Sequence, residues 1–166
     1  MWTETLLVSG VLLSLVGRAQ AQTRLSGALQ CDKGDPQHVI PVGDRADHSF
    51  MITQTKCTWS KPLEVEGAKS TDHLSTFFNE ITGSRVQQRG FAIASYAGGD
   101  KTYTRFQGSG VLKEGVLEST QGTWTTTSGT GKLKGIKAKG TIKGKGSPDG
   151  TTVFEVEGEY ELPKPK

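Results

Sequence analysis

The stretch Gly135–Leu162 reads GIKAKGTIKGKGSPDGTTVFEVEGEYEL, and its two halves have complementary patterns. In the second half, every second residue from Glu155 to Glu161 is a glutamate, and the residues between them are apolar, aromatic or glycine. In the first half, lysines occupy most of the odd-numbered positions. Between the halves, Ser147–Gly150 forms a turn in which proline presets φ and glycine adopts the left-handed conformation. The stretch therefore predicts a β-hairpin in which each strand has one charged face and one apolar face.

Opposite charges predict how the two strands of this hairpin pair. A turn at Ser147–Gly150 places each of three lysines across from a glutamate: Lys143 from Glu155, Lys139 from Glu159 and Lys137 from Glu161. Such a pair contributes a few tenths of a kcal/mol, up to about 1 kcal/mol, and a slip of one residue would bury charge. We therefore interpret the lysines mainly as the outer face of a sheet. The alternative is a weak contact of Lys137, Lys139 and Lys143 with an anionic polysaccharide or lipid head group.

Short runs rich in Thr, Val, Ile, Phe and Tyr, separated by Gly-rich turns, fill most of the chain, and helical periodicity is nearly absent after the first segment. These runs predict strands near residues 49–59, 72–81, 85–96, 101–112, 116–127, 131–145 and 151–162, with a less certain strand near 39–42. About eight strands in series, joined by tight turns, predict an all-β fold. The expected architecture is a single antiparallel up-and-down barrel, with a β-sandwich as the alternative.

The first residues predict export. Leu6–Val16 reads LLVSGVLLSLV and is followed by RAQA, a small-x-small site ending at Ala21. This pattern indicates a signal peptide over residues 1–21, cleaved after Ala21, and its apolar core is too short to span a bilayer comfortably. We expect a barrel domain over residues 22–162 and a polar tail over 163–166. No second apolar stretch predicts a membrane span, so we expect a secreted or periplasmic protein.

Two cysteines, Cys31 and Cys57, follow the predicted cleavage site. An exported chain with two thiols usually pairs them, and the loop closed in this way contributes about 3–4 kcal/mol in the chain-entropy treatment. The formal net charge of +3 is too small to indicate a nucleic-acid partner. The lysine run also argues against nucleic-acid binding, because it contains no aromatic residue on which a base could stack.

Catalytic and cofactor motifs are missing from the sequence. It contains no G-x-S-x-G and no H-E-x-x-H. Gly129–Leu133 (GTGKL) resembles a phosphate-binding loop only superficially, because Thr126 stands at the first Walker glycine and Leu133 at the required Ser or Thr. We interpret it as a turn entering a strand. The sequence therefore predicts no cofactor and no bound metal.

His48 is the histidine with the strongest sequence context. The segment HVIPVGDRADHSF places it close to His38, Asp44 and Asp47, a weak signal for a mixed histidine and carboxylate metal site. We favour a polar residue that anchors a loop at the barrel mouth. A general acid or base is the alternative, so His48 is a weak catalytic candidate and also a candidate ligand contact.

A second candidate site comes from the hairpin around Gly98-Gly99. A two-residue turn there aligns Phe91 with Phe106 and predicts that Phe91, Ile93 and Phe106 belong to the core. The other face then carries Tyr103 and Arg105, and the next hairpin sets Trp124 opposite Arg105. Tyr103, Arg105 and Trp124 would line a ligand cavity if this face is inside. The favoured interpretation places the face outside, with Arg105 lying on Trp124 as a cation–π pair.

Gly122-Thr-Trp124, followed by SGTGKLKGIKAKGT over Ser128–Thr141, resembles the GGTGKFxGxxG signature of the allene oxide cyclase and dirigent-like barrel proteins. It is similar also to small exported bacterial proteins of unassigned function that carry this signature and a terminal E-G-E-Y segment. The resemblance covers residues 101–162, with a fainter match over 43–59. It implies a calycin-like, eight-stranded barrel with a central pocket. Ser128 replaces the first glycine, and Ala138 stands where a glycine is frequent. No catalytic residue is carried over, because the signature is a turn-and-strand motif.

These observations predict an exported barrel that binds a small, partly apolar or phenolic ligand without catalysis. One alternative is a cofactor-free enzyme of the isomerase or cyclase type. The other is a surface interaction protein that uses the lysine strand to bind anionic polysaccharide or lipid head groups.

Overall fold

The computed structural model describes residues 22–163, so the predicted signal peptide and the end of the predicted tail lie outside the described residues. Residues 22–163 contain no helix that could span a bilayer. Ten strands and one short 3-10 turn follow one another: β1 (Thr23–Cys31), β2 (Gln37–Pro41), β3 (His48–Lys61), β4 (Glu64–Val65), β5 (Ala68–Thr82), β6 (Arg85–Tyr96), β7 (Lys101–Lys113), β8 (Val116–Gly129), η1 (Gly131–Leu133), β9 (Lys137–Gly146) and β10 (Thr152–Glu161).

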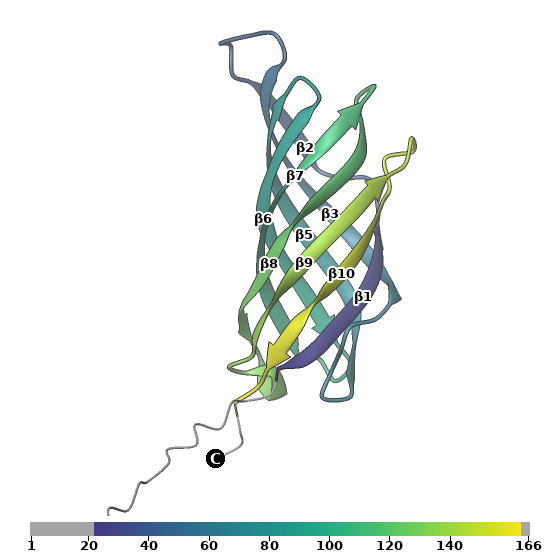
Figure 1. Cartoon of the computed structure of the whole chain (residues 1–166), viewed down its shortest axis with the longest axis vertical. Helices are drawn as coiled ribbons and strands as arrows, with labels where there is room; N and C mark the ends of the chain where they lie inside the picture. The colour runs from purple at the N-terminus through teal and green to yellow at the C-terminus, as the bar shows by residue number, and fades with distance from the viewer. Residues whose placement is uncertain (1–21, 164–166) are drawn as a thin grey trace, which may run out of the picture.

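Eight of these strands form a closed antiparallel barrel (Figure 1). Each strand from β5 to β10 pairs with the next, β10 pairs with β1, β1 pairs with β3, and β3 pairs with β5. The two other strands extend this sheet, since β2 pairs with the first half of β3 and β4 pairs with the start of β5. The predicted all-β class and the antiparallel barrel are therefore confirmed.

The β9–β10 hairpin has the register that the charges predict. All three lysines lie opposite the expected glutamates in the ladder: Lys143 opposite Glu155, Lys139 opposite Glu159 and Lys137 opposite Glu161. Lys139 Nζ lies 3.3 Å from Glu159 Oε1, and both side chains are on the outside of the barrel. The apolar residues of the same strands point inward, where Phe154, Val156 and Tyr160 are buried. The lysine run is thus one outer wall of the barrel.

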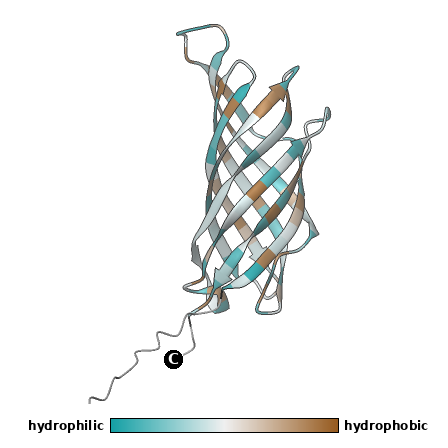
Figure 2. Ribbon diagram, in the orientation of Figure 1, coloured by the Kyte–Doolittle hydropathy of each residue, from teal (hydrophilic) through white to brown (hydrophobic). Residues whose placement is uncertain are grey.

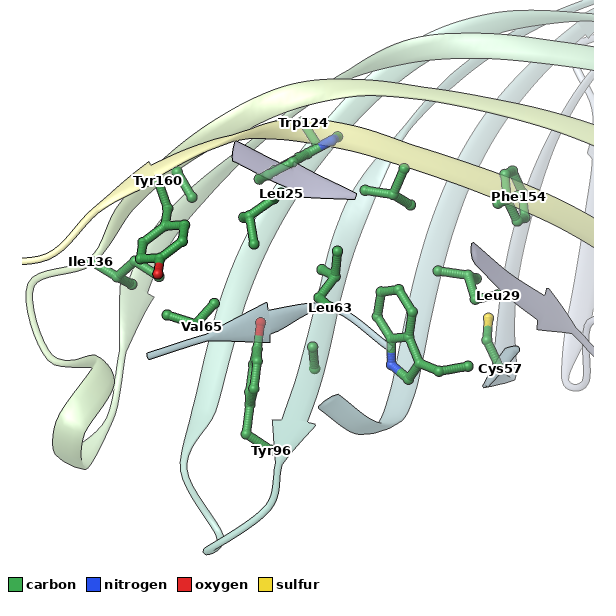
Figure 3. Close-up of a cluster of buried hydrophobic side chains, with 14 of the residues drawn as sticks. Leu25, Leu29, Cys57, Leu63, Val65, Tyr96, Trp124, Ile136, Phe154 and Tyr160 are labelled. Atoms are coloured by element: carbon green, nitrogen blue, oxygen red, sulfur yellow. The ribbon is translucent and has the colours of Figure 1, made fainter. Parts of the chain in front are cut away.

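Inward-facing side chains form a core that closes one end of the barrel. Hydrophobic and hydrophilic residues alternate along the strands (Figure 2), as a barrel with a filled interior requires. The chain between β3 and β5 brings Leu63 and Val65 into this core, and η1 adds Leu133. Val65 is fully buried. Figure 3 shows Leu63 and Val65 in the same cluster as Tyr96 and Tyr160. The closed end therefore lies where β4 and η1 meet the barrel strands.

The first barrel strand is missing from the strands that the sequence predicts. β1 supplies the eighth barrel strand, whereas the less certain strand near residues 39–42 is β2, whose residues are all exposed. β1 has a regular alternation, with Leu25 and Leu29 pointing inward. Its Gly27 and Ala28 have low β-propensity and obscure the pattern. Gly27 is nevertheless required, because a Cβ there would lie 2.9 Å from the Lys61 carbonyl oxygen.

β9 begins at Lys137, six residues later than the predicted start at 131. The intervening residues form η1 and its flanking turn, since Gly131 and Gly135 have positive φ values of 50° and 80°. The Asp100 carboxylate lies against Gly131 and accepts a hydrogen bond from the Lys132 backbone N–H at 3.1 Å. The interpretation of Gly129–Leu133 as a turn entering a strand is confirmed. A carboxylate at this position also disfavours phosphate.

Candidate ligand-binding cavity

A cavity of about 80 Å³ lies inside the barrel, next to the closed end. All eight barrel strands contribute side chains to its wall. Leu25 from β1 and Leu63 and Val65 from the β4 region form its apolar end. Trp59, Tyr96, Phe106 and Trp124 supply aromatic walls. Among the described residues, no Asp, Glu, Lys or Arg lines this inner cavity. A molecule held here is therefore surrounded by apolar groups and a few neutral polar ones.

The strands make room for these large rings by presenting glycine opposite them. A Cβ at Gly158 would lie 2.5 Å from Trp124 Cζ2, and one at Gly140 would lie 2.7 Å from the same atom. Trp124 also satisfies its own polar group, since its indole N–H donates to the Thr141 carbonyl oxygen at 3.1 Å. The ring is thereby fixed flat against β9 and β10, and it forms a rigid part of the cavity wall.

A wider outer chamber of about 470 Å³ continues from the inner cavity. The two spaces share four lining residues, which form a neck between them: Cys31, Phe77, Gln88 and Phe154. The outer chamber mixes apolar side chains such as Met51 and Leu112 with polar ones such as Thr53 and Asn79, and Asp32, Lys33 and Asp149 stand in its wall. The interior thus changes from uncharged at the closed end to charged in the outer chamber.

The disulfide predicted from the two cysteines is present at this neck. Cys31 of β1 faces Cys57 of β3 in the sheet, and their sulfur atoms are bonded. Both cysteines are buried, with 2% and 6% of their surface exposed. A disulfide is compatible with an oxidising, exported location. It joins the two strands at the edge of the inner cavity.

Four buried polar side-chain atoms make no hydrogen bond within the described part of the chain: Thr53 Oγ1, Trp59 Nε1, His73 Nδ1 and Asn79 Oδ1. Trp59 and His73 line the inner cavity, and Thr53 and Asn79 line the outer chamber. An unsatisfied buried donor or acceptor costs about 1–3 kcal/mol, and such atoms are rare in folded proteins. Four of them inside one barrel mark its interior as the candidate site.

Besides Tyr96, whose pKa is raised by burial, the titratable side chain that lines the inner cavity in the described chain is His73. Its Nε2 lies 2.9 Å from Ser75 Oγ. Burial lowers the pKa of His73 to about 4, so the ring is neutral near pH 7. His73 as a whole residue is half-buried, and it lines the inner cavity. The inner cavity consequently holds no net charge under neutral conditions.

The predicted group of Tyr103, Arg105 and Trp124 does not share a face. The β6–β7 and β7–β8 pairings each differ by one residue from the predicted alignment, so Phe91 pairs with Arg105, and Phe106 pairs with Trp124. Trp124 and Phe106 point inward, whereas Tyr103 and Arg105 point outward. The expected Arg105–Trp124 cation–π contact is therefore wrong.

The shift in the β6–β7 pairing also changes which of the predicted core residues point inward. Phe91 is 61% exposed, and Ile93 lies on the same outer face of β6. Phe106 packs against the core, as predicted. The cause is the connection after Tyr96, whose N–H donates to the Asp100 carbonyl oxygen at 2.8 Å. This contact replaces the symmetric two-residue turn at Gly98-Gly99, and it reverses the faces of β7 relative to β6.

His48 lies outside the barrel and lines neither chamber. Its Nδ1 is 2.7 Å from Asp44 Oδ1, and its Nε2 is 3.1 Å from Glu80 Oε1. These contacts tie the loop between β2 and β3 to β5, which confirms that His48 anchors a loop. Residues 22–163 contain no group of three or more His, Cys, Asp or Glu side chains arranged to hold a metal.

Sequence reasoning missed Trp59 and His73 as site residues. The signal that finds them is the disulfide, because it fixes Cys57 as inward-facing. Trp59 then points inward by the alternation of β3, and His73 points inward because it pairs with Cys57. No model of a known protein family matches the sequence, and no curated protein is significantly similar to it. The site is therefore interpreted from its geometry.

Proposed function

We propose that this protein binds a small, partly apolar molecule inside its barrel and does not catalyse a reaction on it. One observation carries the proposal: an uncharged inner cavity, walled by aromatic and aliphatic side chains, opens through a neck into a wider outer chamber. Ligand sites are typically concave and mostly apolar, with a few placed polar groups. Because the sequence predicts a signal peptide, we propose that binding takes place in the periplasm or outside the cell.

The polar groups of the inner cavity favour binding over catalysis. His73 and Ser75 are close enough to form a base and a nucleophile. A base is most effective when its pKa lies near the working pH, and burial lowers the pKa of His73 to about 4. In addition, no side chain of the described range orients His73 through Nδ1, as the third member of a catalytic triad does. The cofactor-free enzyme is therefore the less supported proposal.

Intrinsic fluorescence gives a direct test. The chain has three tryptophans; Trp2 belongs to the predicted signal peptide, and Trp59 and Trp124 both line the inner cavity. The mature protein should be titrated with aliphatic alcohols of increasing chain length and with an alkylphenol. We expect a saturable change in emission with one binding site per chain. Ala138→Phe, which fills the inner cavity, should abolish the change while the circular dichroism of the barrel is kept. Unchanged emission with every compound would contradict the proposal.

A further inference from the structure

Two unpartnered polar atoms of the inner cavity come from neighbouring rings on one wall. Trp59 lies on β3 and His73 on β5, and these strands pair directly. Their rings meet edge to face, with centroids 5.5 Å apart and an interplanar angle of 85°. Trp59 Nε1 and His73 Nδ1 are both buried and have no hydrogen-bond partner in the described chain. Because both residues line the inner cavity, these two atoms are unpartnered polar groups of its wall.

The chemistry of the two atoms restricts what this group can be. An indole N–H only donates, so the ligand must present an acceptor to Trp59. His73 is neutral, and Ser75 pairs with Nε2 either as donor or as acceptor, so Nδ1 can accept from a hydroxyl or donate to a carbonyl. A hydrocarbon leaves both atoms unpaired. A carboxylate or an ammonium group would bring an uncompensated charge into an uncharged cavity, which is strongly unfavourable.

We propose that Trp59 and His73 form a recognition pair for one uncharged oxygen group, a hydroxyl or a carbonyl, on an otherwise apolar ligand. The inference rests on the proposed function and adds the ligand class to it. The apolar body of the ligand lies among Leu25, Leu63 and Trp124, and the oxygen accepts the hydrogen bond of Trp59. A site built to bind an oxygen discriminates against the analogue that lacks it, because its own polar atoms are then left unpaired.

The test compares four ligands of the same chain length: n-hexane, 1-hexanol, 2-hexanone and hexanoate. Isothermal titration calorimetry of the mature protein measures the affinity for each. We expect hexanol and hexanone to bind about tenfold more tightly than hexane, as one or two neutral hydrogen bonds provide. We expect hexanoate to bind more weakly than hexane. Equal affinity for hexane and hexanol would overturn the recognition pair and leave the cavity-binding proposal standing, whereas no binding of any of the four ligands would overturn both.

Variants assign the preference to the two residues. Trp59→Phe and His73→Phe keep an aromatic ring and remove the nitrogen atoms, so each should bring the hexanol-to-hexane affinity ratio close to one. Trp124→Phe is the matched control: it also removes an indole N–H from the cavity wall, but that N–H is already bonded to Thr141. The control should weaken hexane and hexanol equally and keep the ratio. A wild-type ratio in both Trp59→Phe and His73→Phe, with folding verified by circular dichroism, would overturn the proposal.

Discussion

At the scale of single residues, the neutrality of His73 should make the stability of the protein depend on pH. Burial lowers the pKa of His73 from its ordinary 6.5 to about 4 in the folded state. Between these values the unfolded chain binds a proton that the folded chain does not, so the free energy of unfolding falls as pH falls. The contribution is complete above about pH 6.5 and decreases by about 2–3 kcal/mol on acidification to pH 4.

Urea unfolding of wild type and His73→Asn between pH 4 and 8 measures this contribution. The variant cannot titrate at this position, so its stability should fall less steeply on acidification. The other two histidines and the carboxylates are common to both proteins and cancel in the comparison. Parallel pH profiles for the two proteins would show that His73 binds a proton as readily in the folded state as in the unfolded chain, which contradicts a pKa lowered by burial.

At the scale of elements, two hairpins show which features of the fold the sequence predicts. The register of β9–β10 follows from the sequence because a Pro-Asp-Gly turn and three charge pairs specify the same alignment. The register of β6–β7 does not, because size suggests Phe91 inside and Ala92 outside, the reverse of the structure. A narrow barrel already filled by rings needs small residues on several strands: a Cβ at Gly90 would lie 2.5 Å from Phe106 Cζ. Hydrophobicity alone therefore misassigns the faces of β6.

The charge pairs of the β9–β10 hairpin should stabilise its register by a small, salt-dependent amount. Lys139→Glu places two glutamates opposite each other and should lower the free energy of unfolding by about 0.5–1 kcal/mol. The double variant Lys139→Glu/Glu159→Lys should recover most of this loss. Urea unfolding of the complete double-mutant cycle gives the coupling energy, which should decrease in 1 M salt because exposed charges are screened. A coupling energy of zero at low salt would mean that the alternation of the strands alone sets the register.

At the scale of the whole molecule, the sequence predicts a barrel but not where it closes. Tight turns specify the pairings between consecutive strands, whereas β1 pairs with β10 from the other end of the chain and with β3 beyond β2. Such pairings leave no local signal in the sequence. The β1–β3 seam is short and has a register shift between Ala28 and Leu29. The wall of the candidate cavity is complete only when this seam closes, although Trp59 and His73 already meet through the β3–β5 pairing.

The disulfide should therefore control the closure of the barrel as well as its stability. It joins β1 to β3 at the end of this short seam, across a sequence separation of 26 residues. Replacing Cys31 and Cys57 together by alanine should lower the free energy of unfolding by about 3–4 kcal/mol, as measured in urea. Hydrogen exchange should rise first along β1 and the second half of β3, and much less along the β6–β7 and β9–β10 hairpins. The same variant should bind 1-hexanol more weakly, because the neck of the inner cavity includes Cys31. Uniform exchange throughout the barrel, with unchanged hexanol affinity, would show that the β1–β3 hydrogen bonds close the wall without the disulfide.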